Sequence, residues 1–168
     1  MEGLLIRPME PGDWPWVADI YRQGLESGKA TFATECPDYP QWDGAHLPLC
    51  RFVAVINGRM VGWTALSPTS SRWAYRGVAE VSVYVDSAAQ GRGVGTALLE
   101  TLCRESEQAG IWSLYAAIFS TNAASIALHR KCGFREIGYR EIGYRERIAQ
   151  DRFGVWQNTT LMERRAKD

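Results

Sequence analysis

The chain has 168 residues, of which 46% are apolar, enough for one domain with a buried core. Its 19 Lys and Arg balance its 19 Asp and Glu, so no overall charge attracts nucleic acid or an acidic membrane surface. The chain has no run of 18 apolar residues, and its first residues lack the basic and apolar segments of a secretory signal. We therefore expect one cytosolic domain, residues 1–168, that binds neither nucleic acid nor membrane.

The first part of the chain predicts a strand, a helix and a proline-rich loop. Residues 4–7 favour a short strand, and apolar residues at helical spacing predict a helix that begins after the N-cap Asp13. Residues 29–48 contain three prolines and suit a loop with one short helix. In this loop we expect Trp42 to fill the core, whereas Phe32 could either fill the core or wall a small-molecule pocket.

A hairpin and an alternating strand follow. Residues 51–56 and 60–66 flank the pair Asn57-Gly58, which tolerates positive φ angles and so marks a tight antiparallel turn. After a polar loop, the side chains of residues 79–86 alternate between an apolar face of three valines and a polar face. The polar face carries Glu80, Ser82 and Tyr84.

The second half of the chain predicts two more helices and two more strands. Apolar residues from Val94 onwards follow helical spacing, residues 113–119 favour a buried strand, and residues 122–131 favour a short helix. The last strand is expected over 155–163. This order predicts a single-domain α/β fold with a mixed, mostly antiparallel central sheet flanked by helices.

A glycine-rich turn joins the alternating strand to the helix that begins at Val94. Gly91, Gly93 and Gly95 have no Cβ, so backbone N–H groups can face outward. The turn also precedes a helix N-terminus, where unpaired N–H groups and the helix dipole favour a phosphate. We therefore expect a ligand with a diphosphate here. The alternative is that these glycines only form a tight connection.

Three cofactor classes use such a turn, and the sequence separates them. A nucleotide P-loop requires Lys and then Ser or Thr after its last glycine, but Thr96 and Ala97 follow Gly95. The dinucleotide pattern G-x-G-x-x-G requires a glycine at position 96. The remaining pattern, Q-x-x-G-x-G from Gln90 through Gly93 to Gly95, resembles the coenzyme A-binding signature of the GCN5-related N-acetyltransferases (GNAT). The predicted order of elements also resembles the fold of that family.

The resemblance implies acyl transfer from a thioester to an amine, which needs a base. Glu80 is the candidate, because it shares the polar strand face with Ser82 and Tyr84. Burial must raise the pKa of this carboxyl, or a water must relay the proton. The alternative is that Glu80 only forms an ion pair with Arg72 or Arg76. A backbone N–H of the same strand can stabilise the developing oxyanion.

His129 is the candidate acid for the departing thiolate. In many members of this superfamily a Tyr occupies the position, in a stretch that runs from an Asn to Gly-Phe. Here the stretch runs from Asn122 to Phe134 and contains Leu128-His129, which departs from that pattern. A His can donate a proton near neutral pH, but a lone His at a helix edge can equally be structural.

Further motifs narrow the resemblance to the phosphinothricin and methionine sulfoximine N-acetyltransferases. They are AYR, Glu80 with SVYV, QGRGVG, N-x-x-S-x-x-L-H and a final G-x-W, and the resemblance is strongest from Ala74 to Phe134. It implies acetylation of the α-amine of a small amino-acid analogue, with acetyl-CoA as donor, no metal, and a homodimer. The residues that it implies for CoA binding are Val83, Tyr84, Val85, Gln90, Gly91, Arg92, Gly93, Val94, Gly95, Thr96, Asn122 and Lys131.

An acceptor of this class carries a carboxylate, for which a bidentate arginine is the expected partner. Arg76 is the first candidate, with Phe32 and Tyr75 as walls of the pocket. A polycationic acceptor would favour an acidic pocket, whereas residues 70–77 carry arginines. Two alternatives stay open: an acetyltransferase for another amine, such as a polyamine, an antibiotic or a protein N-terminus, and a non-catalytic module that senses acetyl-CoA.

A short tandem repeat lies near the end of the chain, because residues 135–139 and 140–144 both read REIGY. An odd insertion would turn every later side chain of a strand to the other face. We therefore expect the five extra residues to form a longer loop or a bulge. The alternative is that this connection borders the acceptor pocket or a subunit contact and alters specificity.

The four cysteines form no C-x-x-C pair, and the chain has only two histidines, so we expect no zinc cluster. Nothing near them in sequence would lower a thiol pKa, and we expect reduced, mostly buried thiols rather than a nucleophile. These residues are Cys36, Cys50, Cys103 and Cys132.

Overall fold

The computed structural model describes residues 3–137 and 144–166. In this part of the chain, eight strands form one mixed sheet, joined by four α-helices and three 3-10 turns. The strands are β1 (Leu4–Pro8), β2 (Phe52–Ile56), β3 (Arg59–Pro68), β4 (Val78–Val85), β5 (Ser113–Phe119), β6 (Arg135–Glu136), β7 (Tyr144–Gln150) and β8 (Trp156–Arg165). The helices and turns are α1 (Trp14–Ser27), α2 (Tyr39–Ala45), α3 (Val94–Gln108), α4 (Ala123–Lys131), η1 (Pro11–Asp13), η2 (Trp73–Tyr75) and η3 (Ser87–Ala89).

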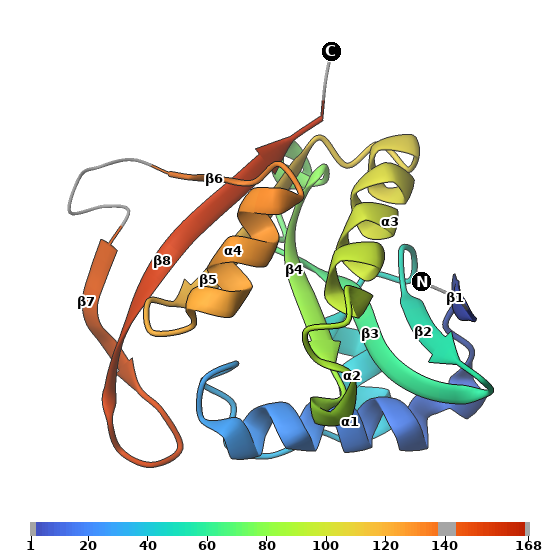
Figure 1. Cartoon of the computed structure of the whole chain (residues 1–168). Helices are drawn as coiled ribbons and strands as arrows, with labels where there is room; N and C mark the ends of the chain where they lie inside the picture. Colours follow the sequence, from blue (N-terminus) through green and yellow to red (C-terminus); the bar gives the residue numbers. More distant parts are fainter. Residues whose placement is uncertain (1–2, 138–143, 167–168) are drawn as a thin grey trace.

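The strand order across the sheet is β1-β2-β3-β4-β5-β8-β6, and β7 also pairs with β8 (Figure 1). Strands β1 to β4 are antiparallel to one another, β4 and β5 are parallel, and β5, β6 and β7 are each antiparallel to β8. The predicted mixed, mostly antiparallel sheet is therefore confirmed. The last strand begins one residue later and ends two residues later than the sequence predicts.

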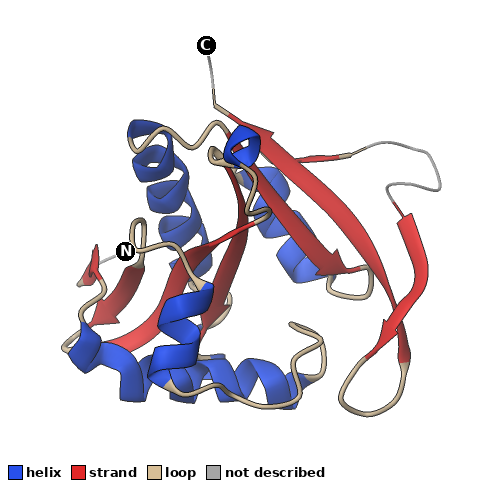
Figure 2. Ribbon diagram, turned by 180° about the vertical axis from the view of Figure 1, so that it is seen from behind, coloured by secondary structure: helices blue, strands red, loops and turns tan. Residues whose placement is uncertain are grey.

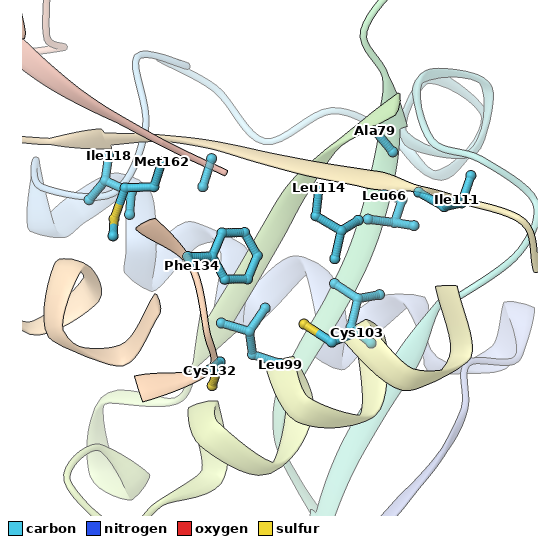
Figure 3. Packing of buried hydrophobic residues seen from close by; sticks show 12 residues of the cluster. Leu66, Ala79, Leu99, Cys103, Ile111, Leu114, Ile118, Cys132, Phe134 and Met162 are labelled. Carbon is cyan, nitrogen blue, oxygen red and sulfur yellow. The ribbon is translucent and has the colours of Figure 1, made fainter. Parts of the chain in front are cut away.

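Helices cover both faces of the sheet, with α3 and α4 on the face seen in Figure 1 and α1 and α2 on the face seen in Figure 2. Between α3 and the sheet lies the larger part of the core. Figure 3 shows Leu99 and Cys103 of α3 near Leu66 of β3, Leu114 of β5 and Phe134, all of them buried. Burial of each large apolar side chain contributes roughly 1.5–3 kcal/mol, so this contact holds α3 on the sheet.

A second cluster packs α1 and α2 against the opposite face. Val17 and Ile20 of α1 meet Trp42 of α2 and Trp63 of β3, and all four are buried. Trp42 is 2% exposed, which confirms its expected place in the core.

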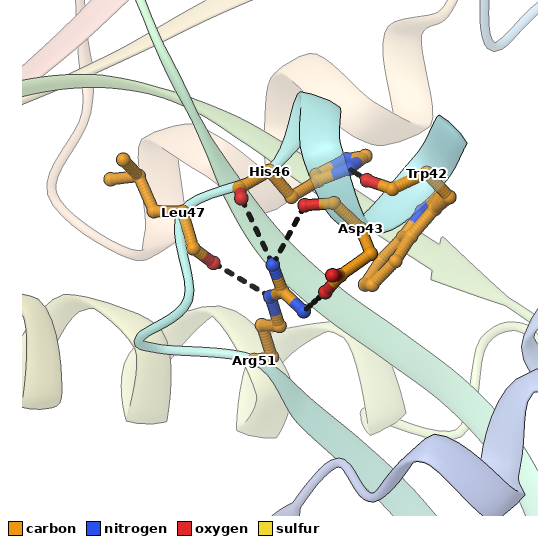
Figure 4. Close-up of polar contacts among 5 residues, drawn as sticks. All are labelled: Trp42, Asp43, His46, Leu47 and Arg51. Atoms are coloured by element: carbon orange, nitrogen blue, oxygen red, sulfur yellow. Dashed lines mark hydrogen bonds and ion pairs between the residues drawn. The ribbon is translucent and has the colours of Figure 1, made fainter. Parts of the chain in front are cut away.

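The segment after α2 is held by one arginine at the start of β2 (Figure 4). Arg51 donates from Nε to the carbonyl of Leu47 at 2.6 Å, and from Nη2 to the carbonyls of Asp43 and His46 at 3.0 and 2.9 Å. It also forms an ion pair with the carboxylate of Asp43. These bonds satisfy carbonyls at the end of α2, where a helix leaves such groups unpaired, and they fix Trp42 beneath the sheet.

Local turn signals were predicted correctly. Asn57 and Gly58 have φ angles of 50° and 78° and join β2 to β3 as an antiparallel hairpin. Gly28 follows α1 with a φ of 64°, the left-handed conformation that commonly ends a helix. Asp13 is the N-cap of α1 by position, as predicted, but its side chain makes no capping bond to the helix. It accepts from Arg7 at 2.7 and 2.8 Å, which holds the pKa of its carboxyl below the usual value.

Much of the REIGY repeat lies outside the described residues, since positions 138–143 are not among them. The strands on either side both pair with β8. Arg135 pairs with Glu163, and Tyr144 pairs with Thr160. Tyr144 follows Arg135 by nine residues, whereas their partners on β8 are only three residues apart. The excess of six residues is even, and the alternation of faces is therefore kept on both sides. The expected loop or bulge itself falls outside the described residues and stays a prediction.

Candidate active site

Strands β4 and β5 form a fork. β3 pairs with residues 79–85 of β4, but β5 pairs only with residues 78–80. Beyond Glu80 the edge of β4 that faces β5 has no recorded strand partner in the described part of the chain. An extended ligand with amide groups can pair with such an edge as an added strand would.

The glycine turn lies at the start of α3, as predicted. Gly91 and Gly93 have φ angles of 72° and 79°, in the left-handed region that favours glycine, and Gly93 is the N-cap of α3. The amide of Ala97 donates to the carbonyl of Gly93 at 3.1 Å as the first turn of the helix closes. The preceding amides lie ahead of the helix ladder, where an anion can accept from them.

Gly95 has a different reason to be a glycine. A Cβ at this position would lie 3.1 Å from Leu128 Cδ2 and 3.5 Å from Val85 Cγ2. The residue therefore allows α3 to approach α4 and β4 closely. By contrast, a Cβ at Gly91 would meet nothing within 4 Å, so this part of the turn faces open space.

A cavity of about 200 Å³ runs through the fork. Its walls come from the loop after α1, from β4 and β5, and from α4. It brings together six candidate site residues from three separate segments, and one of the six is Val83. The other five are Phe32, Glu80, Tyr84, Asn122 and His129.

Glu80 lines this cavity and forms no ion pair in the described part of the chain. Burial raises the pKa of its carboxyl above the usual value. The structure therefore gives no support to a purely structural ion pair with Arg72 or Arg76. It also supplies the raised basicity that proton abstraction from an amine needs.

His129 is buried, with only 2% of its surface exposed. Its Nδ1 lies 2.8 Å from the carbonyl oxygen of Ser125, and its ring meets Phe134 edge-on at 5.0 Å. Because a carbonyl only accepts, Nδ1 carries a proton, and in the neutral ring Nε2 is then an acceptor. Burial lowers the pKa of His129 despite the bond to Ser125, which favours this neutral form near pH 7.

Two further aromatic residues of the cavity are held by the core. The Tyr84 ring stacks on Trp63 at 4.7 Å and meets Tyr21 edge-on at 5.0 Å. Burial raises the pKa of the Tyr84 hydroxyl above its ordinary value. Phe32 packs on Phe119 at 4.6 Å. Phe32 therefore both fills space and walls the cavity, the two alternatives that the sequence left open.

Asn122 ties two walls of the cavity together. Its side-chain oxygen accepts from the amide of Ser125 at 3.1 Å and caps α4, while its Nδ2 donates to the carbonyl of Lys29 at 3.0 Å. Helix α4 is thus fastened to the loop after α1. The sequence predicts a helix that begins at Asn122, but neither its cap role nor its bond to the loop.

A second cavity, of about 610 Å³, lies on the other side of Glu80. The two lining sets share a single described residue, Glu80. The carboxyl thus stands at the junction of two spaces, as a base between donor and acceptor must. The residues that line the second cavity are Pro68, Thr69, Ser70, Tyr75, Val78, Glu80, Ser113, Tyr115 and Glu163.

Some predicted residues lie apart from both cavities. The guanidinium of Arg76 lies over the rings of Trp73 and Trp112, at 4.4 and 5.2 Å from their centroids, and it donates to the Trp73 carbonyl at 3.3 Å. Lys131 is exposed at the end of α4, and Gln90 is exposed at the start of the glycine turn. None of these three is among the residues that line the two cavities.

The cysteine thiols have raised pKa values, about 12 for Cys103 and about 11 for Cys132, because burial disfavours the thiolate. Burial likewise raises the pKa of Cys36 and of Cys50. Over residues 3–137 and 144–166, no group of three or more His, Cys, Asp or Glu side chains could hold a metal ion. In the same ranges no helix has the length and apolar character to cross a membrane.

Three features suit an enzyme that transfers an acyl group: a fork with an open strand edge, an amide-lined helix N-terminus, and a half-buried carboxyl with a raised pKa. The model of a family described as "Acetyltransferase (GNAT) family" matches residues 15–134. The chain therefore belongs to the GNAT family of acetyltransferases, and its fold is the GNAT fold.

Relatives with named substrates share much of the chain. It is 33% identical over 168 residues to a phosphinothricin N-acetyltransferase of Alcaligenes faecalis, which covers 95% of this chain and 81% of the relative. It is 37% identical over 106 residues to an L-methionine sulfoximine/L-methionine sulfone acetyltransferase of Pseudomonas aeruginosa, over 63% of this chain and 58% of the relative. A crystal structure of a GNAT superfamily phosphinothricin acetyltransferase from Sinorhizobium meliloti, in complex with acetyl-CoA, matches with a TM-score of 0.85 and 27% identity, over 97% and 88% of the two chains.

Proposed function

We propose that this N-acetyltransferase acetylates the α-amine of a small amino-acid analogue of the phosphinothricin, methionine sulfoximine or methionine sulfone class, by direct transfer from acetyl-CoA. The observation that carries the proposal is the position of Glu80, which alone among the described residues lines both cavities. A base at this junction can reach an amine on one side while a thioester lies on the other. The substrates named for the relatives supply the acceptor class.

The residues present fit acetyl-CoA. The open edge of β4 at Val83–Val85 offers backbone partners for the amide-bearing arm, and the turn from Gln90 to Thr96 offers amides for the diphosphate. Asn122 lines the cavity between them, and Lys131 lies at the far end of α4 as a candidate contact. When bound, acetyl-CoA supplies an activated acetyl group.

Glu80 accepts a proton from the ammonium of the acceptor, directly or through one water. The neutral nitrogen then forms a bond to the acetyl carbon, the bond from this carbon to sulfur breaks, and the thiolate leaves and takes up a proton. A backbone N–H of β4 stabilises the oxyanion between these two steps. The second nitrogen proton leaves as the amide forms, so one proton is released overall at neutral pH.

His129 remains the candidate donor of a proton to the departing sulfur, under one restriction. Because Nδ1 donates to the Ser125 carbonyl, only the imidazolium has a proton at Nε2 to give. Burial lowers the pKa of this ring and makes the imidazolium scarce at neutral pH. We therefore expect water to protonate the sulfur above pH 7.

For the acceptor, Tyr75 and Phe32 are the proposed walls, and Arg76 is the proposed partner of the carboxylate. Tyr75 lines the second cavity, whereas Phe32 lines the first, on the donor side, and so contacts an acceptor only where the two cavities meet at Glu80. Arg76 can reach a carboxylate only if its guanidinium leaves the rings of Trp73 and Trp112. We also propose that the enzyme is cytoplasmic and that it forms a homodimer. Light scattering of the purified chain would test the homodimer.

The test is the release of free CoA thiol in the presence of a panel of amines. The panel holds phosphinothricin, methionine sulfoximine, methionine sulfone, ordinary amino acids and polyamines. We expect thiol release with the first three compounds. Release only with polyamines would contradict the acceptor class. Saturable CoA binding without release against any amine would support a sensing module instead.

A further inference from the structure

Four charged or polar side chains form a row across adjacent strands. Glu80 of β4 faces Tyr115 of β5, Tyr115 faces Glu163 of β8, and Glu163 faces Arg135 of β6. Directly opposed residues share one face of a sheet, so all four side chains leave the sheet on the same side. The first three line the second cavity, and the row therefore runs along its floor from Glu80 outwards.

The lining of this cavity is acidic and hydroxyl-rich. Glu80 and Glu163 supply two carboxyls, and five other side chains supply hydroxyl groups. No Lys, Arg or His is among the described residues that line it, so the arginines of residues 70–77 do not make this cavity cationic. The sequence-based argument from them against a polycationic acceptor therefore does not hold. An acceptor in this space meets the candidate base at one end and a second carboxylate at the other.

Glu163 is held in place as a charged group. Its carboxylate forms an ion pair with Arg135, and its side chain is 18% exposed against 66% for Arg135. Arg135 thus fixes the carboxylate from the solvent side, and Glu163 is the member of the pair that faces the cavity. Two strand spacings, about 10 Å in all, separate Glu163 from Glu80 along the row.

We propose that Glu163 is a specificity-determining residue, which favours acceptors whose side chain ends in a neutral polar group and disfavours those that end in an anion. The inference rests on the proposed function, because it takes the acceptor amine to lie at Glu80. The side chain of such an acceptor then extends along the row towards Glu163. A terminal sulfone or sulfoximine adds no charge there, whereas a phosphinate brings a second anion close to a half-buried carboxylate. Like charges in such an arrangement disfavour binding.

The test is the ratio of kcat/KM for methionine sulfone to kcat/KM for phosphinothricin, in the wild type and in Glu163→Gln. We expect the wild type to favour methionine sulfone, and the substitution to shift the ratio towards phosphinothricin by about tenfold. Glu136→Gln is the matched control. Glu136 also forms a surface ion pair, with Arg130, but it faces the core residue Met162 on the other side of the sheet. This control should leave the ratio within about twofold.

A double variant, Arg135→Gln with Glu163→Gln, excludes the opposite arrangement. If Glu163 repels the anion, the double variant keeps the relaxed ratio of Glu163→Gln. If Arg135 instead binds the anion once Glu163 is removed, the shift of the kcat/KM ratio towards phosphinothricin disappears in the double variant, and the proposal is wrong. An unchanged ratio in Glu163→Gln also overturns it.

Calorimetric binding of both compounds in the presence of CoA separates this inference from the proposed function. If both compounds turn over and Glu163→Gln leaves the ratio of their kcat/KM values unchanged, the inference about Glu163 is wrong while the proposed function stands. Binding without turnover defeats the proposed function, while the ratio of the two dissociation constants still decides the role of Glu163. No binding of either compound defeats both.

Discussion

Glu80 and Tyr115 face each other in the last recorded rung of the parallel pair β4–β5, and beyond that rung the register ends. Glu80 therefore stands at the closed end of the fork. A base in this position can serve an amine from one cavity while the open edge of β4 holds the thioester in the other. Under the proposed function, the strand pairing itself thus brings donor, acceptor and base to one point.

Activity should depend on pH through Glu80. Burial raises the pKa of its carboxyl, so kcat/KM should fall as the pH drops through a value above that of an ordinary glutamate. A pH profile of kcat/KM for the best acceptor measures this fall in activity on the acidic side. If kcat/KM falls only at the ordinary glutamate pKa, or does not fall at all down to pH 4, Glu80 does not act as the base.

Stability should show the same raised pKa with a definite sign. The folded protein binds the Glu80 proton more tightly than the unfolded chain, so this group lowers the free energy of unfolding as the pH rises through the raised pKa. Glu80→Gln should therefore melt at a higher temperature than the wild type at pH 7, and the gain should vanish below the ordinary glutamate pKa. Thermal melts from pH 4 to pH 8 test this, and a lower melting temperature at pH 7 would contradict it.

His129→Gln should lower kcat less than about tenfold at pH 7.5, because the neutral ring has no proton at Nε2 to donate. The measurement is steady-state thiol release with wild type and variant at the same pH. A loss of a hundredfold or more, together with a kcat that falls as the pH rises through a depressed histidine pKa, would instead make His129 the acid.

Gly95→Ala should lower the stability relative to Gly44→Ala by about 1 kcal/mol, because its Cβ meets Leu128 across the contact between α3 and α4 and this offsets the gain from alanine as the better helix former. Gly44→Ala is the control. Its Cβ would meet nothing within 4 Å, and alanine is the better helix former, so it should be neutral or stabilising by up to about 1 kcal/mol. Urea unfolding of both variants provides the comparison. Equal stability of the two would show that α3 and α4 do not need this glycine.

The sequence predicts most elements because their signals are local. The caps and stops of α1, the hairpin turn at Asn57-Gly58 and the alternation in β4 each depend on neighbouring residues alone. The candidate base was found in the same way, since Glu80 lies on the polar side of an alternating strand that leads into the glycine turn.

The missed residues depend on contacts between distant strands. Glu163 enters the second cavity only because β8 lies between β5 and β6, an order that no local pattern reveals. Tyr115 could have been found from the alternation within residues 113–119, as the residue that shares the Glu80 face. The packing role of Gly95 depends on Leu128, 33 positions further along the chain, and so the sequence grouped it with the two glycines of the turn.

The central claim is that Glu80 is the base that lets this enzyme transfer acetyl directly from acetyl-CoA to an α-amine. The most direct measurement is thiol release with methionine sulfone or phosphinothricin by wild type and Glu80→Gln, alongside calorimetric binding of CoA to both. We predict that the wild type releases thiol in step with acetylated amine, and that the variant binds CoA equally but loses about a hundredfold or more in kcat/KM. Equal activity of the two proteins would contradict the account.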